Sequence, residues 1–274
     1  MPELPEVETL KVSLEKELLQ KTIVNVDIRR PKLRYLLDHD LKSKIIGARI
    51  LGLYRRAKYL LLELDNSHTV VIHLGMTGRA TGQAENYHLQ KHDHVALYLS
   101  GARKLVFNDA RRFGMIYCLP SDNLMQHKIF ASSGPEPLEE DFSAEYLLKK
   151  LKNKKVPIKT ALMQNEIVVG VGNIYASESL FLAKINPLKL ANSLSVDETN
   201  RLVEAVKKVL WQAIKAGGTT LKDFVDGDNK PGYFKQKLLV YDREGKACIA
   251  CDSGSIAKLR QAGRSTFYCD ICQK

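Results

Sequence analysis

The first residues of the chain combine groups that can perform covalent amine chemistry. Proline is the second residue, and the carboxylate of Glu3 follows it directly. Removal of the initiator methionine would give Pro2 a free amine with a pKa near ~8, so that far more of it is neutral at pH 7 than of a lysine. A neutral amine can attack an electrophilic carbon, and the adduct of a secondary amine with an aldehyde is a charged iminium. Pro2 and Glu3 therefore suggest a nucleophile with a proton donor, although the dipeptide alone is more typical of an ordinary helix start.

A second group of reactive side chains lies at the C-terminal end of the chain. Cys248 and Cys251 form one closely spaced pair, and Cys269 and Cys272 form another after an interval of seventeen residues. This spacing is typical of two knuckles that bind one tetrahedral Zn²⁺ through four thiolates. Four sulfur ligands leave no position for water, so the pattern predicts a structural zinc. The fifth cysteine, Cys118, stands alone and is expected to be a buried apolar residue in a reducing compartment.

The composition favours a globular protein with an acidic partner. The chain has 274 residues, 45% of them apolar, and a formal net charge of +11. This length allows two domains with cores of their own, and the positive charge favours a polyanion such as nucleic acid. No apolar run approaches the ~20 residues that span a bilayer, and the start does not resemble a secretory signal. We therefore expect a soluble, cytoplasmic protein with no membrane partner.

The reactive terminus is followed by the pattern of an amphipathic helix. Pro5 suits the first turn, where a missing N–H costs little, and Glu6 and Glu8 lie near the positive end of the helix. One apolar stripe then follows at spacings of three and four residues: Val7, Leu10, Leu14 and Leu18. We expect this packed helix to hold Pro2 in place.

Short strand patterns occupy residues 22–118. The clearest segments are residues 24–28, 45–54, 59–64, 70–73, 95–99 and 104–107. Their length and regular spacing predict an antiparallel β-sandwich or barrel. With the first helix, they predict an N-terminal catalytic β-sandwich domain over residues 1–133.

Helical patterns follow the proline-rich stretch 134–137. Ser143 is expected to cap one helix, and the glycines of residues 170–173 interrupt the next. Ser195 and Glu198 form a capping box for a long helix that ends at Gly217-Gly218. Residues 219–234 predict a mobile loop. The expected organisation is an α+β multidomain chain, with a helical domain over 134–237 and a zinc finger over 238–274.

Several long motifs, in order along the whole chain, closely resemble the bacterial formamidopyrimidine-DNA glycosylase family. They are residues 1–9, 55–60, 73–76, 91–94, 111–114, 134–138 and 168–180, together with the four-cysteine finger. The resemblance implies a bifunctional base-excision repair enzyme acting on double-stranded DNA that contains oxidised purines, chiefly 8-oxoguanine and formamidopyrimidines. It also implies a monomer in which the helical domain 134–237 binds DNA and the finger 238–274 is a β-hairpin zinc finger.

The resemblance further implies roles for particular residues. Pro2 would attack the anomeric carbon of the sugar, and Glu3 would donate a proton that helps to open the ring. Lys58 matches a proton donor in β-elimination, and Arg264 matches a finger arginine that contacts phosphate in δ-elimination. Met76, Arg111 and Phe113 match residues that fill the void left by the flipped base, although periodicity alone would place Met76 and Phe113 in the core. Other positions match DNA contacts: His73, His92, Lys154 and Asn173.

Two further assignments follow from the same motifs. Residues 170–173 match the turn of a helix–two-turns–helix motif, and loop 218–234 matches the one that closes over the flipped base. For His92 and His94, which alternate in a strand, the alternatives are a metal pair or a structural pair; the metal pair is disfavoured because no third ligand is apparent nearby in the sequence. The chain departs from the family pattern at Ala110, where proline is usual, and at Gln164, where an acid is common.

Three other functional classes compete with this assignment. A paralogous class shares Pro2, Glu3 and the finger but excises oxidised pyrimidines; its start differs at the positions of Leu4 and Val7. A non-catalytic zinc-finger DNA-binding protein would need no Pro-Glu terminus. A tautomerase-like enzyme also uses an N-terminal proline, but the long basic chain and the finger argue against that class.

Overall fold

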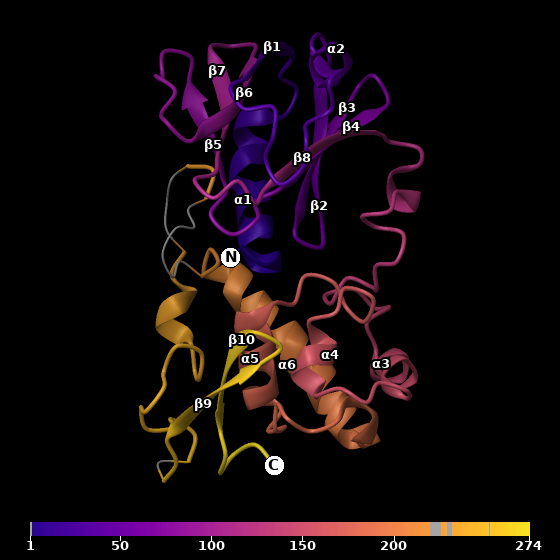
Figure 1. The fold of residues 1–274 in the computed structure, drawn as a ribbon, viewed down its shortest axis with the longest axis vertical. Helices are drawn as coiled ribbons and strands as arrows, with labels where there is room; N and C mark the ends of the chain where they lie inside the picture. The colour runs from indigo at the N-terminus through magenta and orange to yellow at the C-terminus, as the bar shows by residue number, and fades with distance from the viewer. Residues whose placement is uncertain (1, 220–225, 229–231, 252) are drawn as a thin grey trace. The chain divides into compact units, whose positions relative to one another are not determined.

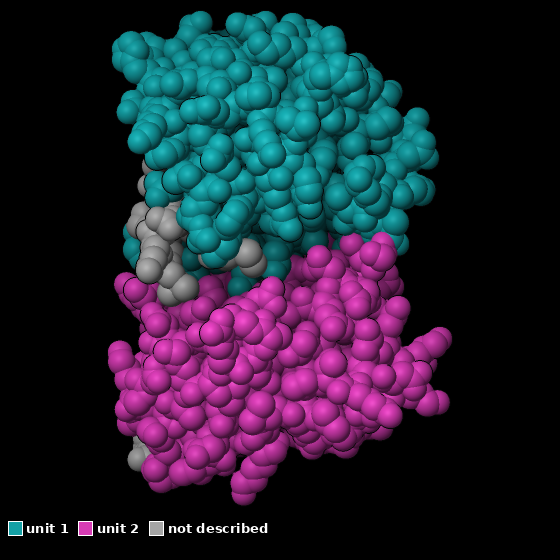
Figure 2. Space-filling model, in the orientation of Figure 1, with its two compact units in different colours: residues 1–131, 216–233 teal, residues 132–215, 234–274 magenta. Residues whose placement is uncertain are grey.

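The computed structural model describes residues 2–219, 226–228, 232–251 and 253–274 (Figure 1). The chain divides into two compact units, coloured separately in Figure 2. Unit 1 contains residues 1–131 and 216–233, and unit 2 contains residues 132–215 and 234–274. The predicted division into domains 1–133, 134–237 and 238–274 stays a prediction.

Unit 1 begins with the predicted helix, α1 (Leu4–Leu18). Glu3 is the N-cap and forms a capping box with Glu6, in which each side chain accepts a bond from the other residue's backbone. The predicted apolar stripe is buried along its whole length, with Leu10 and Leu14 fully inaccessible. The helix start is therefore held both by its cap and by its packing.

Two four-stranded antiparallel sheets complete unit 1 and confirm the predicted sandwich. One sheet has the order β1 (Ile23–Ile28), β6 (Asp93–Leu99), β7 (Arg103–Asn108), β5 (Arg79–Ala84). The other has the order β2 (Ile50–Arg56), β3 (Tyr59–Leu64), β4 (His68–His73), β8 (Met115–Pro120). Helix α1 contacts strands of both sheets, and its apolar stripe shares one core with them (Figure 1).

Two local predictions in unit 1 were wrong or incomplete. The predicted strand 45–54 begins only at Ile50, because the preceding residues form a short helix, α2 (Leu41–Ile45). Gly47 then adopts a φ of 88°, which turns the chain before the strand starts. Strands β5 and β8 were not among the predicted segments, and the segment RATGQA of β5 has little apolar alternation.

Unit 2 contains the predicted helices. They are α3 (Ala144–Leu151), α5 (Asn173–Leu182) and α6 (Val196–Lys215), whereas a further short helix, α4 (Ile158–Leu162), was not predicted. Ser143 caps α3 by accepting the Tyr146 N–H at 3.1 Å. Ser195 and Glu198 exchange the two bonds of a capping box at 2.9 and 3.1 Å, as predicted. Within the described ranges, no helix is long and apolar enough to cross a membrane.

A short finger follows the helices in unit 2. A 3₁₀ turn (Phe234–Lys237) leads to an antiparallel hairpin of β9 (Ile256–Gln261) and β10 (Arg264–Cys269). Ala262 and Gly263 form the hairpin turn with φ values of 45° and 77°, a combination typical of two-residue hairpin loops. Phe181 of α5 packs into the small apolar core of this finger. Short 3₁₀ turns also occur at Leu124–Gln126 and Ala191–Ser193.

Candidate active site and nucleic-acid interface

The terminal residues of the proposed active site are buried in unit 1. Pro2 is buried and Glu3 is 2% exposed. The Glu6 carboxylate accepts the Glu3 N–H at 2.7 Å through one oxygen and the Thr219 N–H at 2.7 Å through the other. Glu6 therefore joins the start of α1 to the segment that follows α6. The sequence did not identify this role for Glu6, because its backbone partner lies more than two hundred residues away in the chain.

Glycines allow that second segment to approach the terminus. Gly218 has a φ of 79°, and a Cβ there would lie 3.1 Å from a Glu6 oxygen. Further along, Gly227 donates its N–H to Ser13 Oγ at 2.8 Å and accepts the Gly82 N–H at 3.2 Å. The predicted closing function of loop 218–234 falls on residues 220–225 and 229–231, which lie outside the described residues.

Lys58 lies in the tight turn between β2 and β3. Ala57 of that turn has a φ of 54°, and Arg55 donates to its carbonyl at 3.1 Å. Arg55 also binds Glu8 of α1 at 2.7 Å. Burial acts to raise the pKa of Glu8, but the bonds from Lys11 and Arg55 outweigh it and hold that pKa below its usual value. The ionised Glu8 thus ties the Lys58 turn to the helix that carries Pro2 and Glu3.

His73 is a neutral hydrogen-bond donor at the end of β4. Its Nδ1 accepts the Gly75 N–H at 3.0 Å, so the ring proton is on Nε2. Burial, together with the positive charges of Lys58 and Arg34, lowers the pKa of His73 to about 4. A neutral imidazole with Nε2–H can donate to a phosphate oxygen across the physiological pH range.

This depressed pKa predicts a stability effect of defined sign. The folded protein resists protonation of His73 while the unfolded chain accepts a proton near pH 6.5, so stability falls as the pH drops from about 6.5 toward about 4. Between pH 7.5 and 4.5, the free energy of unfolding of His73→Gln should therefore fall by roughly 2–3 kcal/mol less than that of wild type. Urea unfolding of both proteins at the two pH values measures the difference. Parallel pH profiles for the two proteins would contradict the assignment.

The three predicted void-filling residues lie on neighbouring loops of unit 1. Met76 and Phe113 are 40% and 41% exposed, which is unusual for apolar side chains of this size. The Arg111 guanidinium lies over the Phe113 ring at 4.7 Å from its centre. Gly75 has a φ of 65°, and a Cβ there would come within 2.4 Å of the Phe113 backbone. The structure thus brings the two loops together, and we call Met76, Arg111 and Phe113 the wedge cluster.

A buried carboxylate organises the wedge cluster. Asp109 is fully buried, and its two oxygens accept the Thr77 hydroxyl and the Gly114 N–H, each at 2.7 Å. The first oxygen also accepts the Arg111 N–H at 3.3 Å. Because Thr77 follows Met76 and Gly114 follows Phe113, one side chain fixes the backbone beside all three wedge residues.

Removal of this carboxylate should loosen both loops. We expect Asp109→Ala to destabilise the protein by about 2–4 kcal/mol, because it leaves the Gly114 N–H and the Thr77 hydroxyl without their buried acceptor. Asp109→Asn should cost less, since an amide can accept from Gly114 and donate to Thr77. Urea unfolding measures both variants. Equal stability of the alanine variant and wild type would show that Asp109 does not hold these loops.

His94 lies in β6 and His92 directly precedes that strand, and the two side chains have different surroundings. His94 is buried and its Nε2 lies 2.9 Å from the Asp109 carbonyl oxygen, to which it donates a proton. Burial lowers the pKa of His94. His92 is half-buried, and its ring lies 6.3 Å from that of His94 in an edge-to-face arrangement. Among the described residues, the only cluster suited to a metal is the four cysteines, so the metal alternative for the histidine pair gains no support.

In unit 2, a buried lysine joins α4 and the start of α5 to the finger. Lys159 of α4 is 1% exposed, and its Nζ donates to Asn173 Oδ1 at 2.7 Å. The same Nζ donates to the Ser265 carbonyl at 3.0 Å and the Thr266 hydroxyl at 2.8 Å. Asn173 also donates to the Ser265 carbonyl at 2.9 Å. Asn173 and β10 are thereby held together, and Arg264 is exposed at the start of that strand.

A second buried group attaches the finger to α5. Glu178 accepts the backbone N–H groups of Leu239, Val240 and Tyr241 at 2.8, 3.0 and 2.8 Å. Burial raises the pKa of Glu178, and the three N–H donors oppose that rise. The Tyr241 hydroxyl accepts a bond from Asn173 Nδ2 at 3.3 Å. The chain entering the finger is therefore fixed against the same helix that Asn173 begins.

Lys154 is another predicted DNA contact in unit 2. It follows α3, and its Nζ donates to Gln164 Oε1 and Glu166 Oε1, both at 3.3 Å. Gln164 is the position where the family commonly has an acid. Here the ion pair is made with Glu166 two residues later, and the lysine remains half-exposed.

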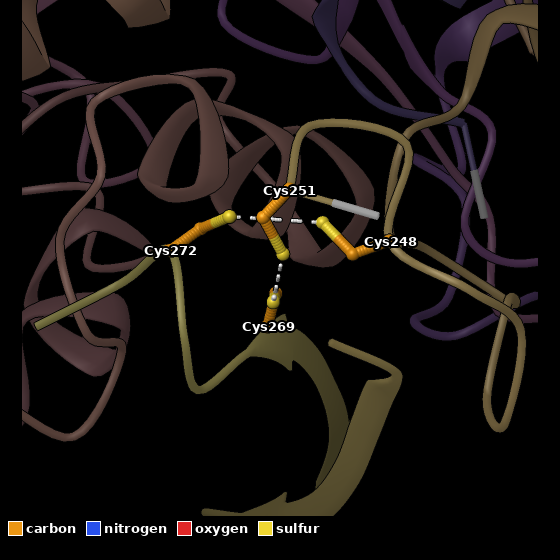
Figure 3. A group of neighbouring side chains, drawn as sticks. All are labelled: Cys248, Cys251, Cys269 and Cys272. Carbon is orange, nitrogen blue, oxygen red and sulfur yellow. Dashed lines mark hydrogen bonds between the residues drawn. The ribbon is translucent and has the colours of Figure 1, made fainter. Parts of the chain in front are cut away.

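The four cysteines converge on one point, as Figure 3 shows. Their sulfur atoms all lie within 4.8 Å of one another. The Cys248–Cys272 and Cys251–Cys269 sulfur distances are 3.7 and 3.8 Å. Four sulfurs at ~2.3 Å from a tetrahedral Zn²⁺ lie about 3.8 Å apart. A Cβ on Gly254 would lie 2.8 Å from the Cys269 sulfur, so glycine is needed beside the cluster. The arrangement fits a single metal ion.

Two family models match consecutive parts of the chain. The Formamidopyrimidine-DNA glycosylase N-terminal domain matches residues 1–116, and the Formamidopyrimidine-DNA glycosylase H2TH domain matches residues 133–225. Among curated proteins, a formamidopyrimidine-DNA glycosylase of Rickettsia bellii is 57% identical over 274 residues, which cover the whole of both chains.

Comparison with solved structures points to the same family. A Lactococcus lactis Fpg mutant in complex with Fapy-dG-containing DNA matches with a TM-score of 0.93 and 32% identity over the full length of both chains. The MutM (Fpg) protein of Thermus thermophilus matches with a TM-score of 0.90 and 37% identity, over 99% of this chain and 98% of that one. The chain therefore belongs to the formamidopyrimidine-DNA glycosylase family of base-excision repair enzymes, which act on oxidised purines in DNA and also have AP lyase activity.

Proposed function

We propose that this protein excises oxidised purines through the amine of Pro2. The amine attacks the anomeric carbon of the damaged nucleotide, and the bond from that carbon to the base breaks. Glu3 donates a proton that helps to open the sugar ring. The resulting iminium acidifies the adjacent C–H, and β- then δ-elimination cuts the strand on both sides of the sugar.

The observation that carries this proposal is the fixed, buried start of α1. A nucleophile must be held against its target, because correct orientation supplies much of the rate enhancement of such reactions. Pro2 and Glu3 are buried at the N-terminus of a packed helix, and Glu6 bonds to the Glu3 backbone at 2.7 Å. An exposed, unattached Pro-Glu terminus would have favoured a DNA-binding protein without catalysis.

Lys58 and Arg264 are proposed to act on the later steps. Lys58 would donate a proton in β-elimination from a turn that Arg55 and Glu8 tie to α1. Arg264 would contact phosphate and assist δ-elimination from the exposed end of the finger hairpin. Arg264 is exposed, and Lys58 is half-buried.

The wedge cluster is proposed to occupy the gap in the duplex when the damaged nucleotide is flipped out. Apolar side chains beside an arginine can enter a base stack and hold it open. Exposed Met76 and Phe113, with Arg111 over the ring, have this chemistry. His73, His92, Lys154 and Asn173 are proposed to bind the DNA around the lesion.

The metal of the four-cysteine site is proposed to be one structural Zn²⁺. When bound, it would cross-link the chain segments of the finger and leave no coordination position for a substrate. Cys248, Cys251, Cys269 and Cys272 would hold it. The hydrogen bonds of Lys159 and Glu178 would then hold Asn173 and the strand of Arg264 in fixed positions against the metal-bound finger.

Two substrate classes are supported by the solved relatives. One Lactococcus lactis structure contains Fapy-dG DNA, while another contains DNA with an oxidised pyrimidine. We propose oxidised purines, 8-oxoguanine opposite cytosine and formamidopyrimidines, as the main substrates, and oxidised pyrimidines as a second candidate. The protein is proposed to bind such double-stranded DNA as a monomer.

Cleavage of end-labelled duplexes tests the function. One duplex carries 8-oxoguanine opposite cytosine, the second an oxidised pyrimidine, and the third is undamaged. We expect the first to be cut fastest, with phosphate left on both sides of a one-nucleotide gap, and the undamaged duplex to stay intact. Faster cutting of the pyrimidine duplex would move the assignment to the second candidate. Absence of cutting on both lesions would contradict the proposed activity.

A further inference from the structure

The loop after β1 is a concentrated cationic surface of unit 1. Residues 29–37 read RRPKLRYLL, and we call this segment the basic loop. It contains four cations and no carboxylate, and all four are exposed: Arg29, Arg30, Lys32 and Arg34. Within the described part of the chain, Arg30, Lys32 and Arg34 form no salt bridge. Their charge is therefore available to an anionic partner.

The basic loop has a fixed shape. Leu33 and Leu37 are 5% and 9% exposed and belong to the core of the sandwich. The Leu37 N–H bonds to the Pro31 carbonyl at 2.9 Å, and the Leu33 N–H bonds to the Tyr35 carbonyl at 3.0 Å. Because the backbone is already held, binding through this loop would cost little conformational entropy.

The tip of the loop adds apolar side chains to the charge. Tyr35 and Leu36 are 52% and 69% exposed, and the Arg34 guanidinium lies 5.6 Å from the centre of the Tyr35 ring. Cations beside exposed apolar and aromatic groups are the combination that binds a nucleic-acid backbone, with phosphates on the cations and sugars or bases on the apolar surface.

The basic loop borders the wedge cluster. The Arg34 N–H bonds to the Gly114 carbonyl at 3.2 Å, next to Phe113 in the chain. The charge of Arg34 is also close enough to His73 to lower the pKa of that histidine, after burial and Lys58. The loop is thus continuous with the residues proposed to enter the duplex.

We infer that the basic loop binds the sugar–phosphate backbone of duplex DNA beside the flipped nucleotide, with Arg30 and Lys32 on phosphates and Tyr35 and Leu36 on the sugars. This inference rests on the proposed function for the position of the flipped nucleotide. Binding through the loop is independent of the damage itself, so it should raise affinity for damaged and undamaged duplexes alike.

Salt dependence of binding tests the inference. The variant Arg30→Gln/Lys32→Gln is compared with Lys16→Gln/Lys208→Gln, which removes the same charge from exposed lysines of α1 and α6. Each lost phosphate contact should reduce the slope of log affinity against log salt by about 0.9. We expect the loop variant to lose about 1.8 in slope and about tenfold or more in affinity at ~0.1 M salt, and the control to stay near wild type.

A third variant separates the apolar contact from the charge. Tyr35→Ala removes no cation, so it should weaken binding about fivefold without changing the salt slope. Fluorescence anisotropy on an undamaged labelled duplex and on the 8-oxoguanine duplex measures all three variants. A loop variant whose slope and affinity match the lysine control overturns the inference. Loss of binding to phosphatidylglycerol vesicles with unchanged DNA binding overturns it as well, in favour of a membrane surface.

Cleavage assays on the same variants keep the two proposals distinct. If the inference fails while wild type still cuts the 8-oxoguanine duplex, the proposed function stands without the loop. If wild type binds DNA through the loop but cuts neither lesion, the proposed function fails and the DNA-binding surface remains.

Discussion

Replacing Pro2 by glycine is expected to lower the rates of base release and strand cleavage by at least about a hundredfold, because the secondary amine proposed to attack the sugar is lost. A terminal glycine is a primary amine, whose adduct with an aldehyde is a neutral imine until it is protonated. Single-turnover cleavage of the 8-oxoguanine duplex, with and without alkali to reveal base release, measures both steps. DNA affinity should change little, since Pro2 carries only one of many contacts.

Pro5 provides the matched control for this prediction. It is a second buried proline at the start of α1 and lies within the first turn of the helix. Pro5→Ala should retain most of the activity, since alanine is well tolerated in a helix and no amine is altered. Equal activity of Pro2→Gly and wild type would rule out the amine as nucleophile. Equal loss in both proline variants would point to damage of the helix start instead.

Cys251→Ser is expected to release the metal and to abolish specific DNA binding. Zinc binding supplies about 10–16 kcal/mol to folding of small zinc domains, and a hydroxyl does not replace a thiolate ligand. Without the proposed metal, the segment before β9 and the end of β10 lose the cross-link between them, and the hairpin that carries Arg264 is less well fixed. Metal content by mass spectrometry and duplex binding by anisotropy measure the two effects.

Cys118→Ser is the control for that change. Cys118 is 2% exposed in the sandwich core of unit 1, and burial raises the pKa of its thiol to about 11. Because this cysteine lies outside the four-cysteine site, the variant should keep full metal content and DNA binding. Wild-type DNA affinity in Cys251→Ser would contradict the proposed role of the finger.

The elements with strong local patterns were predictable from the sequence. Helix α1 follows from its apolar stripe and from Pro5, and the metal site follows from the spacing of its cysteines. The sandwich was predicted as a class, while the short elements β5, β8, α2 and α4 were not predicted individually. Local sequence therefore determined the long elements better than the short ones.

The candidate site was predictable only where a motif names its residues. Periodicity alone places Met76 and Phe113 in a core, yet both are about two-fifths exposed. Their exposure depends on Asp109, which holds two loops separated by more than thirty residues. A charged residue in a loop normally predicts solvent exposure, so no local pattern indicates that Asp109 is buried.

Lys159 illustrates the same limit in unit 2. Its partners Ser265 and Thr266 are 106 and 107 residues away along the chain, and no local pattern connects them. A lysine on a short helix predicts a solvated side chain. Only the packing of α4 and α5 beside β10 turns it into the link between Asn173 and the finger.

Borohydride trapping tests the central claim of this account most directly. Reduction during the reaction with the 8-oxoguanine duplex should convert the iminium into a stable protein–DNA adduct, and peptide mass spectrometry should place the DNA on the nitrogen of Pro2 in protein that has lost Met1. Pro5→Ala should form the same adduct. An adduct on a lysine, or no adduct from protein that cuts the duplex, would contradict catalysis by the terminal proline.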